Sequence, residues 1–179
     1  AGCGNARNLV EIARQCKKAA GIDSSEKMLG FAAARIRKAE LGEKVELVKA
    51  DVCRLPFAAS EFDKVFCLAV LHHLHKAKRL KAFRELARVL KKGGKLYLSE
   101  WNRDQKKFDG MGEKVNVPWK MSDGRKVARH YYLSSEKEIT KMARKAGLIV
   151  GYVVFEKNGR EHAKRGAKNL CLELWKTTV

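Results

Sequence analysis

The sequence predicts an α/β fold in which helices cover both faces of a mainly parallel sheet. Strand and helix periodicities alternate through most of the chain, and a Gly-x-Gly turn runs directly into the first helical pattern. The last two predicted strands, 149–156 and 169–176, flank a basic loop at 157–168 and should pair antiparallel. At 179 residues, one domain around a single core is expected.

The opening residues AGCGNAR form the glycine turn, and apolar residues at helical spacing follow from Leu9 to Cys16. Asn5 or Asn8 is expected to cap this first helix. A short strand is predicted at residues 18–22, and it ends on Asp23.

The next two elements are a helix and a strand. A helix is expected over residues 26–41, with Ser24 and Ser25 available as caps. Residues 45–50 alternate apolar and polar side chains, as a half-buried strand does, and end on Asp51.

The middle of the chain predicts strand, helix and strand. The run 62–71 is almost continuously apolar, as in a strand covered on both faces. An amphipathic pattern from Leu80 to Leu90 predicts a helix that stops at Gly93 and Gly94, and residues 95–101 predict another strand.

Residues 102–133 have no clear periodicity and are too long for an ordinary connection, so we expect a functional insertion or lid there. After it, Ser134 and Ser135 with Glu138 resemble a capping box that opens a helix ending near Gly147.

Charge is the strongest compositional signal. Lys and Arg number 39 against 20 Asp and Glu, which gives a formal charge of +19 and an isoelectric point of about 9.9. Such a field favours a polyanionic partner such as nucleic acid. The alternative is a lysine-rich solvated surface, because the basic residues are spread through every segment. The same two interpretations apply to the basic helix residues Lys76, Lys78, Arg79, Lys81, Arg84 and Arg88.

The five cysteines are an odd number without a Cys-x-x-Cys pair, so neither a disulfide framework nor a zinc site is expected. Small buried thiols in a reducing compartment are the simplest interpretation, and the cytoplasm is the expected location. No apolar run approaches the roughly 20 residues of a membrane span, and no membrane partner is expected.

Candidate ligand-binding residues follow the first strands of the predicted sheet. In such sheets, ligands bind at the carboxyl ends of the strands. Gly2 and Gly4 permit a tight turn and a close backbone approach, Asp23 can accept both hydroxyls of a ribose, and Asp51 can accept from an adenine amino group. An adenosine-bearing cofactor is therefore expected. The chain lacks the third glycine of a nicotinamide fingerprint, which disfavours pyrophosphate binding.

At this point the sequence resembles a known family. The stretches GCGNAR, GIDSS, ADVCRLPFAASEFDKVFCLAVLHHL and RELARVLKKGGKLYLSEW are similar to the class I S-adenosylmethionine-dependent methyltransferases. The resemblance implies a doubly wound, Rossmann-like, seven-stranded and mainly parallel sheet in the order 3-2-1-4-5-7-6, with S-adenosylmethionine as cofactor. Ala6 departs from the family by replacing the third glycine. The implied cofactor-binding residues are Gly2, Gly4, Asn5, Asp23, Ser24, Met28, Asp51, Val52, Cys67 and Leu68.

The insertion narrows the resemblance. The stretches VPWK at 117–120, RHYYL at 129–133 and LHH at 71–73 are similar to tRNA methyltransferases that esterify 5-carboxymethyluridine at the wobble position, including the domain fused to AlkB-like tRNA hydroxylases. His130 and Tyr132 appear in exchanged positions relative to that family. The resemblance implies His73 and Arg129 as catalytic residues, and Trp101, Trp119 and Tyr131 as substrate-binding residues.

Each of these residues also has a simpler interpretation. Trp119 and Tyr131 could pack the insertion onto the core, and Arg129 could form a surface salt bridge. The histidines His72, His73 and His75 are expected to line a pocket or cap a helix, because a loop-like spacing does not suit a three-histidine metal site.

The resemblance implies two further features. The family has a central strand before the glycine turn, so we expect this sequence to be an N-terminally incomplete version of a longer polypeptide. Members also work with a small zinc-binding activator subunit at the edge of the third strand, where Val45, Leu47 and Val48 offer a pairing edge.

Three functions stay open from the sequence. The favoured one is methylation of the wobble carboxymethyluridine of tRNA. The others are methylation of a small molecule of the quinone or sterol kind, and a non-catalytic scaffold that binds the cofactor or RNA.

Overall fold

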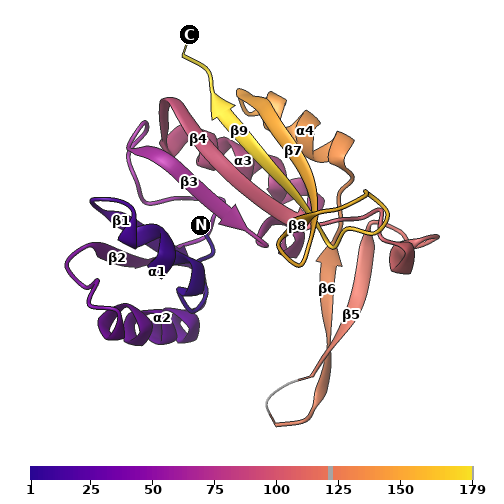
Figure 1. Ribbon diagram of the computed structural model, residues 1–179, viewed down its shortest axis with the longest axis horizontal. Helices are drawn as coiled ribbons and strands as arrows, with labels where there is room; N and C mark the ends of the chain where they lie inside the picture. Colours follow the sequence, from indigo (N-terminus) through magenta and orange to yellow (C-terminus); the bar gives the residue numbers. More distant parts are fainter. Residues whose placement is uncertain (121–122, 179) are drawn as a thin grey trace. The chain divides into compact units, whose positions relative to one another are not determined.

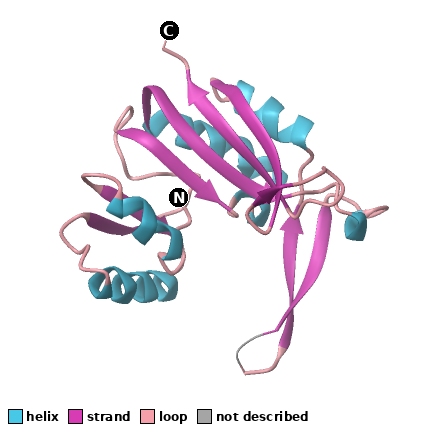
Figure 2. Ribbon diagram, in the orientation of Figure 1, coloured by secondary structure: helices cyan, strands magenta, loops and turns pink. Residues whose placement is uncertain are grey.

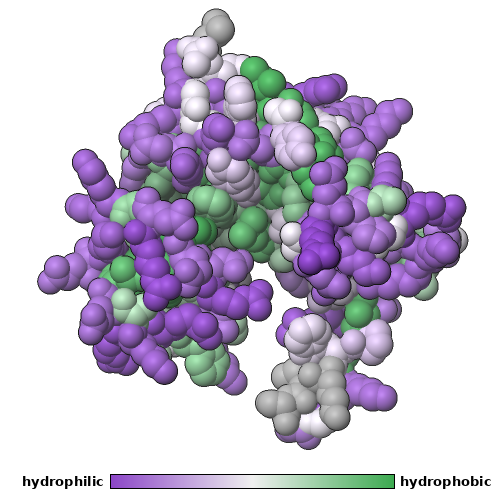
Figure 3. Space-filling model, viewed as in Figure 1, coloured by the Kyte–Doolittle hydropathy of each residue, from purple (hydrophilic) through white to green (hydrophobic). Residues whose placement is uncertain are grey.

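The computed structural model describes residues 1–120 and 123–178 of the chain. These residues divide into two compact units, residues 1–58 and residues 59–179, here called the first and the second unit. Within the described residues, no helix is long and apolar enough to span a membrane. Hydrophilic residues cover most of the face drawn in Figure 3, as the charge of +19 requires.

The first unit is a two-stranded parallel sheet with two helices (Figure 1). Its elements are α1 (Arg7–Arg14), β1 (Ala19–Asp23), α2 (Glu26–Lys38) and β2 (Val45–Lys49). Strand β1 pairs with β2 from Ala19 opposite Val45 to Asp23 opposite Lys49. Apolar side chains of both helices and of the sheet form its core, among them Leu9, Val10, Ala13, Ala32, Ile36 and Val45. This core brings the carboxyl ends of the two strands to one edge.

A five-stranded sheet forms the centre of the second unit, in the order β3-β4-β9-β7-β8. The strands are β3 (Phe62–Leu68), β4 (Leu90–Trp101), β7 (Leu148–Lys157), β8 (Arg160–Glu161) and β9 (Asn169–Lys176). Strands β3 and β4 are parallel, and β9 is antiparallel to both β4 and β7. Thus β3, β4 and β7 run in one direction and β9 in the other. The predicted antiparallel closing pair is confirmed.

Two longer helices of this unit, α3 (Lys76–Val89) and α4 (Glu136–Lys145), lie on one face of the five-stranded sheet (Figure 1). Short 3-10 turns follow β3 and β4, at η1 (Leu71–His73) and η2 (Lys106–Phe108). Turn η1 accounts for the end of the apolar run that predicted a longer strand.

A β-hairpin replaces the irregular insertion that the sequence predicted at residues 102–133. Strands β5 (Lys114–Lys120) and β6 (Lys126–Tyr132) pair antiparallel, and Figure 2 shows them as a pair separate from the central sheet. The pattern was not visible in the sequence because β6 is exposed from Lys126 to His130. A strand that buries neither face has no reason to alternate apolar and polar residues.

Two predicted helix ends are wrong. The N-cap of α1 is Ala6, with φ 61° and no side-chain cap, and Asn5 Oδ1 only accepts from the Arg7 N–H at 3.4 Å. Helix α3 ends at Val89 instead of at the glycines, because the chain turns directly into β4. A Cβ on Gly94 would lie 3.0 Å from the Asp63 carbonyl oxygen, so this glycine permits close strand approach.

Two predicted caps are confirmed. The Ser25 hydroxyl accepts from the Met28 N–H at the start of α2. Ser135 and Glu138 form a reciprocal capping box at the start of α4.

The single seven-stranded sheet is not seen in the described residues. They form a two-stranded parallel sheet, a mixed five-stranded sheet and the hairpin. The central architecture is therefore a mixed sheet, with β9 as its reversed strand.

Candidate active site

The glycine turn of the first unit is held against the end of β1. The Cys3 N–H donates to the Ile22 carbonyl oxygen at 2.7 Å, and Gly2, Gly4 and Ala6 all have positive φ, at 65°, 54° and 61°. Glycine adopts this left-handed backbone without steric cost, whereas Ala6 does so under mild strain. The turn therefore presents backbone rather than side chains at the edge of the sheet.

Asp23 fixes this turn through its carboxylate. Oδ2 accepts from the Gly4 N–H at 2.8 Å, and Oδ1 accepts from the Ser25 N–H at 2.9 Å. A carboxylate offers about four acceptor sites, so each oxygen retains capacity for a further donor. Asp23 can thus hold the turn and accept ligand hydroxyls at the same time.

The second carboxylate lies at the same edge. The Ala50 N–H donates to the Asp23 carbonyl oxygen at 3.1 Å, which places the ends of β1 and β2 side by side. Asp51 follows directly, is exposed, and accepts through Oδ1 from the Cys53 N–H at 2.8 Å. The structure therefore brings together the two carboxylates that the sequence singled out.

The remaining predicted residues of the first unit surround this edge. A Cβ on Gly4 would lie 3.6 Å from the Met28 Cε, so Met28 reaches the turn. Ser24 is exposed, Asn5 is half-buried and Val52 is buried. Paired acceptors beside an open backbone turn fit the hydroxyls and amino group of an adenosine.

In the second unit, the two predicted cofactor residues end β3. Cys67 is fully buried, and burial raises the pKa of its thiol to about 12. The side chain is therefore a neutral core group, and only its backbone is available to a ligand. Leu68 is half-buried at the last position of the strand.

Turn η1 is anchored to the end of β4 by buried polar groups. Glu100 accepts through Oε1 from the Leu71 N–H at 3.0 Å, and its Oε2 lies 3.3 Å from His72 Nδ1. The Trp101 N–H also approaches His72 Nδ1, at 3.4 Å. His72 is therefore a structural residue of the turn that presents His73.

His73 belongs to an aromatic cluster that we define as His73, Trp101, Phe108 and Tyr131. Trp101 stacks on Tyr131 with ring centroids 4.5 Å apart, and His73 lies 4.9 Å from Tyr131. Trp101 also stacks on Phe108 at 6.4 Å. Tyr131 is only 3% exposed, so it supports Trp101 rather than offering a free face. This burial favours the packing role left open for Tyr131.

The pKa of His73 is lowered to about 4. Desolvation is the largest cause, followed by the charges of His72 and Arg129. The imidazole is therefore neutral at physiological pH, and it does not add a cation to the site.

The hairpin presents the other two predicted residues together. The Arg129 guanidinium carbon lies 4.2 Å from the centroid of the Trp119 ring, and both side chains are exposed. Arg129 and Tyr131 are two residues apart on β6, so they share one face of the hairpin. The structure thus brings His73, Trp101, Tyr131, Arg129 and Trp119 to neighbouring positions.

His75 has the capping role that was one of the expectations. Its Nδ1 accepts from the Ala77 N–H at 3.4 Å and caps α3. No group of three potential metal ligands occurs in the part of the chain that the structure describes.

Sequence reasoning gave no structural role to the buried Arg79. Its Nε donates to the Leu74 carbonyl oxygen at 3.1 Å, and its Nη1 donates to the Ser134 hydroxyl. Its Nη2 is buried without a hydrogen-bond partner, and burial lowers the pKa of the guanidinium. Arg79 therefore joins the chain after η1 to the chain after β6. No periodicity marks such a residue, because it belongs to a basic helix face.

The basic face of α3 is less available than the charge pattern predicts. Lys76 pairs with Glu113 at 2.5 Å and Arg88 pairs with Glu85 at 2.7 Å, while Arg79 is buried. These pairs weaken the interpretation of this helix as a phosphate-binding face.

A glycine turn that presents backbone beside paired carboxylates, and a mixed sheet whose last strand along the chain, β9, runs antiparallel between β4 and β7, are features of the class I methyltransferase fold. A solved structure of a SAM-dependent methyltransferase from Methanosarcina mazei matches this fold with a TM-score of 0.80 and 20% identity. The match covers 99% of this chain and 91% of that chain.

The chain belongs to the methyltransferase domain family, whose sequence model matches residues 1–98. A relative from Encephalitozoon cuniculi, named as a methyltransferase, is 31% identical over 158 residues, which are 84% of this chain and 69% of the relative. S-adenosylmethionine is the expected cofactor, and it supplies a methyl group carried on a sulfonium.

Relatives with named substrates are matched over less of their length. The 27-O-demethylrifamycin SV methyltransferase of Amycolatopsis mediterranei is 36% identical over 56% of this chain and 36% of its own length. The tRNA (carboxymethyluridine(34)-5-O)-methyltransferase of Xenopus tropicalis is 31% identical over 58% of this chain, and the chain spans 15% of it.

Proposed function

We propose that this methyltransferase transfers a methyl group to the carboxylate of 5-carboxymethyluridine at the wobble position of a tRNA anticodon. The observation that carries the proposal is the contact between Arg129 and Trp119, at 4.2 Å on an exposed hairpin. A carboxylate attached to a flat base needs a cation and an aromatic face close together, and these two side chains offer that pair.

His73 suits this substrate because it is neutral. A second cation on the carboxylate would withdraw charge from the attacking oxygen and lower its nucleophilicity. With the pKa of His73 near 4, Arg129 is the charged group of this pair. We therefore assign Arg129 to hold the carboxylate and His73 to orient it, with Trp101 and Trp119 as stacking partners and Tyr131 behind Trp101.

The reaction needs positioning more than proton transfer. A carboxylate with a pKa of about 4 is already ionised at neutral pH, so no general base is required. The in-line displacement needs the oxygen aligned with the methyl group, which binding residues can provide. Asp23 and Asp51 would orient the adenosine, while the aromatic side chains exclude water from the carboxylate.

RNA as the substrate is supported by two further observations. The formal charge of +19 suits a polyanionic partner, and the Xenopus tropicalis relative is named for the same wobble reaction. The Amycolatopsis mediterranei relative favours the second candidate, a small-molecule acceptor. In that case Arg129 and Trp119 would not affect turnover.

An activator subunit is part of the proposal. Among the described residues, β2 pairs only with β1, so its other side is an edge. Val45 is buried and Leu47 and Val48 are half-buried along it. A small zinc-binding partner that adds a strand at this edge would complete the enzyme. In this proposal the whole chain acts as one methyltransferase domain.

The test uses labelled S-adenosylmethionine with total tRNA, in the presence of the activator subunit. We expect label on tRNA that mild alkali releases, because an ester hydrolyses where an N-methyl or ribose methyl group does not. Label on a small molecule, or no transfer despite cofactor binding, would reject the proposal.

Two variants of the same hairpin sharpen this test. Arg129→Ala should abolish transfer to tRNA and leave cofactor affinity unchanged. Arg125→Ala is the matched control, since Arg125 is an exposed arginine on the same hairpin and pairs with Asp123 at 2.6 Å. Equal loss in both variants would show that only hairpin charge matters, against a specific role for Arg129.

A further inference from the structure

The basic loop between β7 and β9, residues 157–168, concentrates positively charged side chains on the surface. It contains five Lys and Arg residues and His162, against the single acidic residue Glu161. All of these side chains are exposed.

The loop has a defined backbone. Asn158 and Gly159 have φ of 56° and 79°, the two positive values of a type I′ turn, and Lys157 pairs with Arg160 across it. The His162 N–H then donates to the Phe155 carbonyl oxygen at 2.7 Å. Two cations are thus held on a tight hairpin rather than on a flexible tail.

A buried amide anchors the rest of the loop next to the aromatic cluster. Asn102, which is 1% exposed, donates through Nδ2 to the carbonyl oxygens of Lys164 and Ala167, at 2.6 and 3.1 Å. Its backbone N–H donates to the Lys168 carbonyl oxygen at 3.0 Å. Because Asn102 directly follows Trp101, the loop is fixed beside the proposed stacking residue.

The cations of the loop fall into two groups. Lys164 pairs with Asp104 at 3.2 Å and Arg165 pairs with Asp109 at 2.7 Å. Lys157, Arg160 and Lys168 have no ion pair within the described residues. The first group ties the loop to neighbouring segments. The second group is open to an external anion, although the charge of Lys168 also lowers the pKa of the Glu156 carboxylate.

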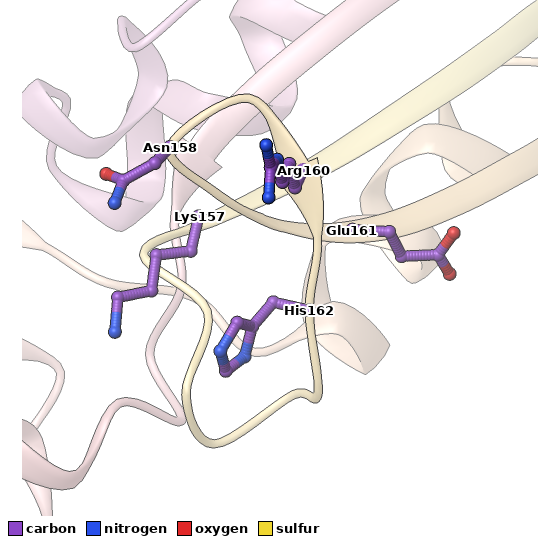
Figure 4. Close-up of a pocket in the computed structure, with 5 residues that line it drawn as sticks. All are labelled: Lys157, Asn158, Arg160, Glu161 and His162. Atoms are coloured by element: carbon purple, nitrogen blue, oxygen red, sulfur yellow. The ribbon is translucent and has the colours of Figure 1, made fainter.

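Figure 4 shows Lys157 and Arg160 of the second group at the wall of a pocket. Lys157, Asn158, Arg160, Glu161 and His162 line a pocket of about 520 Å³. The Glu161 carboxylate points away from Lys157 and His162, so the only acidic side chain of the lining does not neutralise them.

Lys107 extends this surface to Trp101. Its Nζ lies 4.8 Å from the centroid of Trp101 and 4.6 Å from that of Phe108. Burial lowers the pKa of Lys107, and the charge of Lys168 lowers it further. An anion bound by Lys107 and Lys168 together would offset the effect of each charge on the other.

We propose that Lys107, Lys157, Arg160 and Lys168 bind the phosphate backbone of RNA beside the aromatic cluster. They hold the nucleotides that flank the base at Trp101. The identity of that base as 5-carboxymethyluridine rests on the proposed function. The phosphates supply affinity and register, while the aromatic cluster and Arg129 select the modified base.

The test is an RNA-binding titration at several salt concentrations, without cofactor. The probe is a synthetic RNA hairpin with 5-carboxymethyluridine in its loop. The variant is the triple substitution Lys157→Ala, Arg160→Ala and Lys168→Ala. The control triple, Lys141→Ala, Arg144→Ala and Lys145→Ala, removes equal charge from exposed positions at the end of α4.

Each phosphate contact contributes about 0.7 to the slope of log affinity against log salt for single-stranded RNA. The loop triple should therefore reduce the slope by about 2, so that its affinity falls further below wild type at low salt than at high salt, with the control triple close to wild type. Equal slopes for the two triples would overturn the proposal. The proposal would also be overturned if the loop triple bound RNA as wild type does but lost binding to phosphatidylserine vesicles. That result would indicate that the loop binds a membrane surface.

The result is independent of methyl transfer. A reduced slope without ester formation would reject the wobble-uridine function and keep the RNA-binding loop. Ester formation with equal slopes would keep the function and reject the loop.

Discussion

The indole of Trp101 stacks on the phenol ring of Tyr131, with the ring planes 11° apart and the centroids 4.5 Å apart. Trp101 ends β4 and Tyr131 lies on β6, so this contact joins the hairpin to the central sheet of the second unit. We expect Tyr131→Ala to lower the free energy of unfolding by about 3 kcal/mol, because a buried ring is lost. Tyr131→Phe, which keeps the ring, should cost about 1 kcal/mol or less. Urea denaturation followed by circular dichroism would measure both, and equal stability of the two variants would contradict this role.

The depressed pKa of His73 predicts a pH dependence of stability. The folded chain holds this pKa near 4, below the ordinary 6.5, so the unfolded chain binds the proton more readily. The stabilisation by neutral His73 should be complete above pH 6.5 and lost as the pH falls toward 4. Stability of His73→Gln should therefore fall less steeply than wild type over this range. Parallel profiles in denaturation at stepped pH would contradict the assignment.

The hydrogen bond between Arg79 and Ser134 predicts a coupled pair. Ser134→Ala would leave Nη1 of a buried guanidinium without its acceptor, next to the unpartnered Nη2. We expect a loss of about 1–3 kcal/mol in the free energy of unfolding. In an Arg79→Met background the same substitution should cost much less, because no donor remains. A double-mutant cycle with additive costs would argue against the coupling.

Asp23 predicts the sensitivity of cofactor binding. Asp23→Asn places an amide donor against either the Gly4 or the Ser25 N–H and removes the charge. Loss of a charged acceptor should weaken S-adenosylmethionine binding by about ten- to a hundredfold in calorimetry. Glu26→Gln is a suitable control, because it removes an exposed carboxylate at the start of the adjacent helix. An equal effect of both variants would mean that only net charge matters.

The elements of the central fold were predictable because burial imposes periodicity on sequence. Strands β1, β2 and β9 and the capped starts of α2 and α4 lie where the pattern placed them. The end of α3 was not predictable from its glycines, because Gly94 serves strand contact with Asp63 rather than helix termination.

The residues of the candidate site were predictable from the sequence, but the buried polar residues that hold them in place were not. Asp23 stood out at the end of a strand, and its carboxylate does hold the glycine turn. Asn102 and Arg79 gave no signal, because their roles depend on carbonyl oxygens brought close only by the fold. Buried polar anchors of this kind are set by tertiary contacts that no local pattern encodes.

The three tryptophans of the chain, Trp101, Trp119 and Trp175, all lie in residues 59–179. Intrinsic fluorescence therefore observes the second unit alone, while far-ultraviolet circular dichroism observes the helices of both. Coincident melting curves from the two probes would indicate that the two units unfold in one cooperative transition. Separated curves would indicate that the first unit unfolds in a transition that circular dichroism detects and tryptophan fluorescence does not.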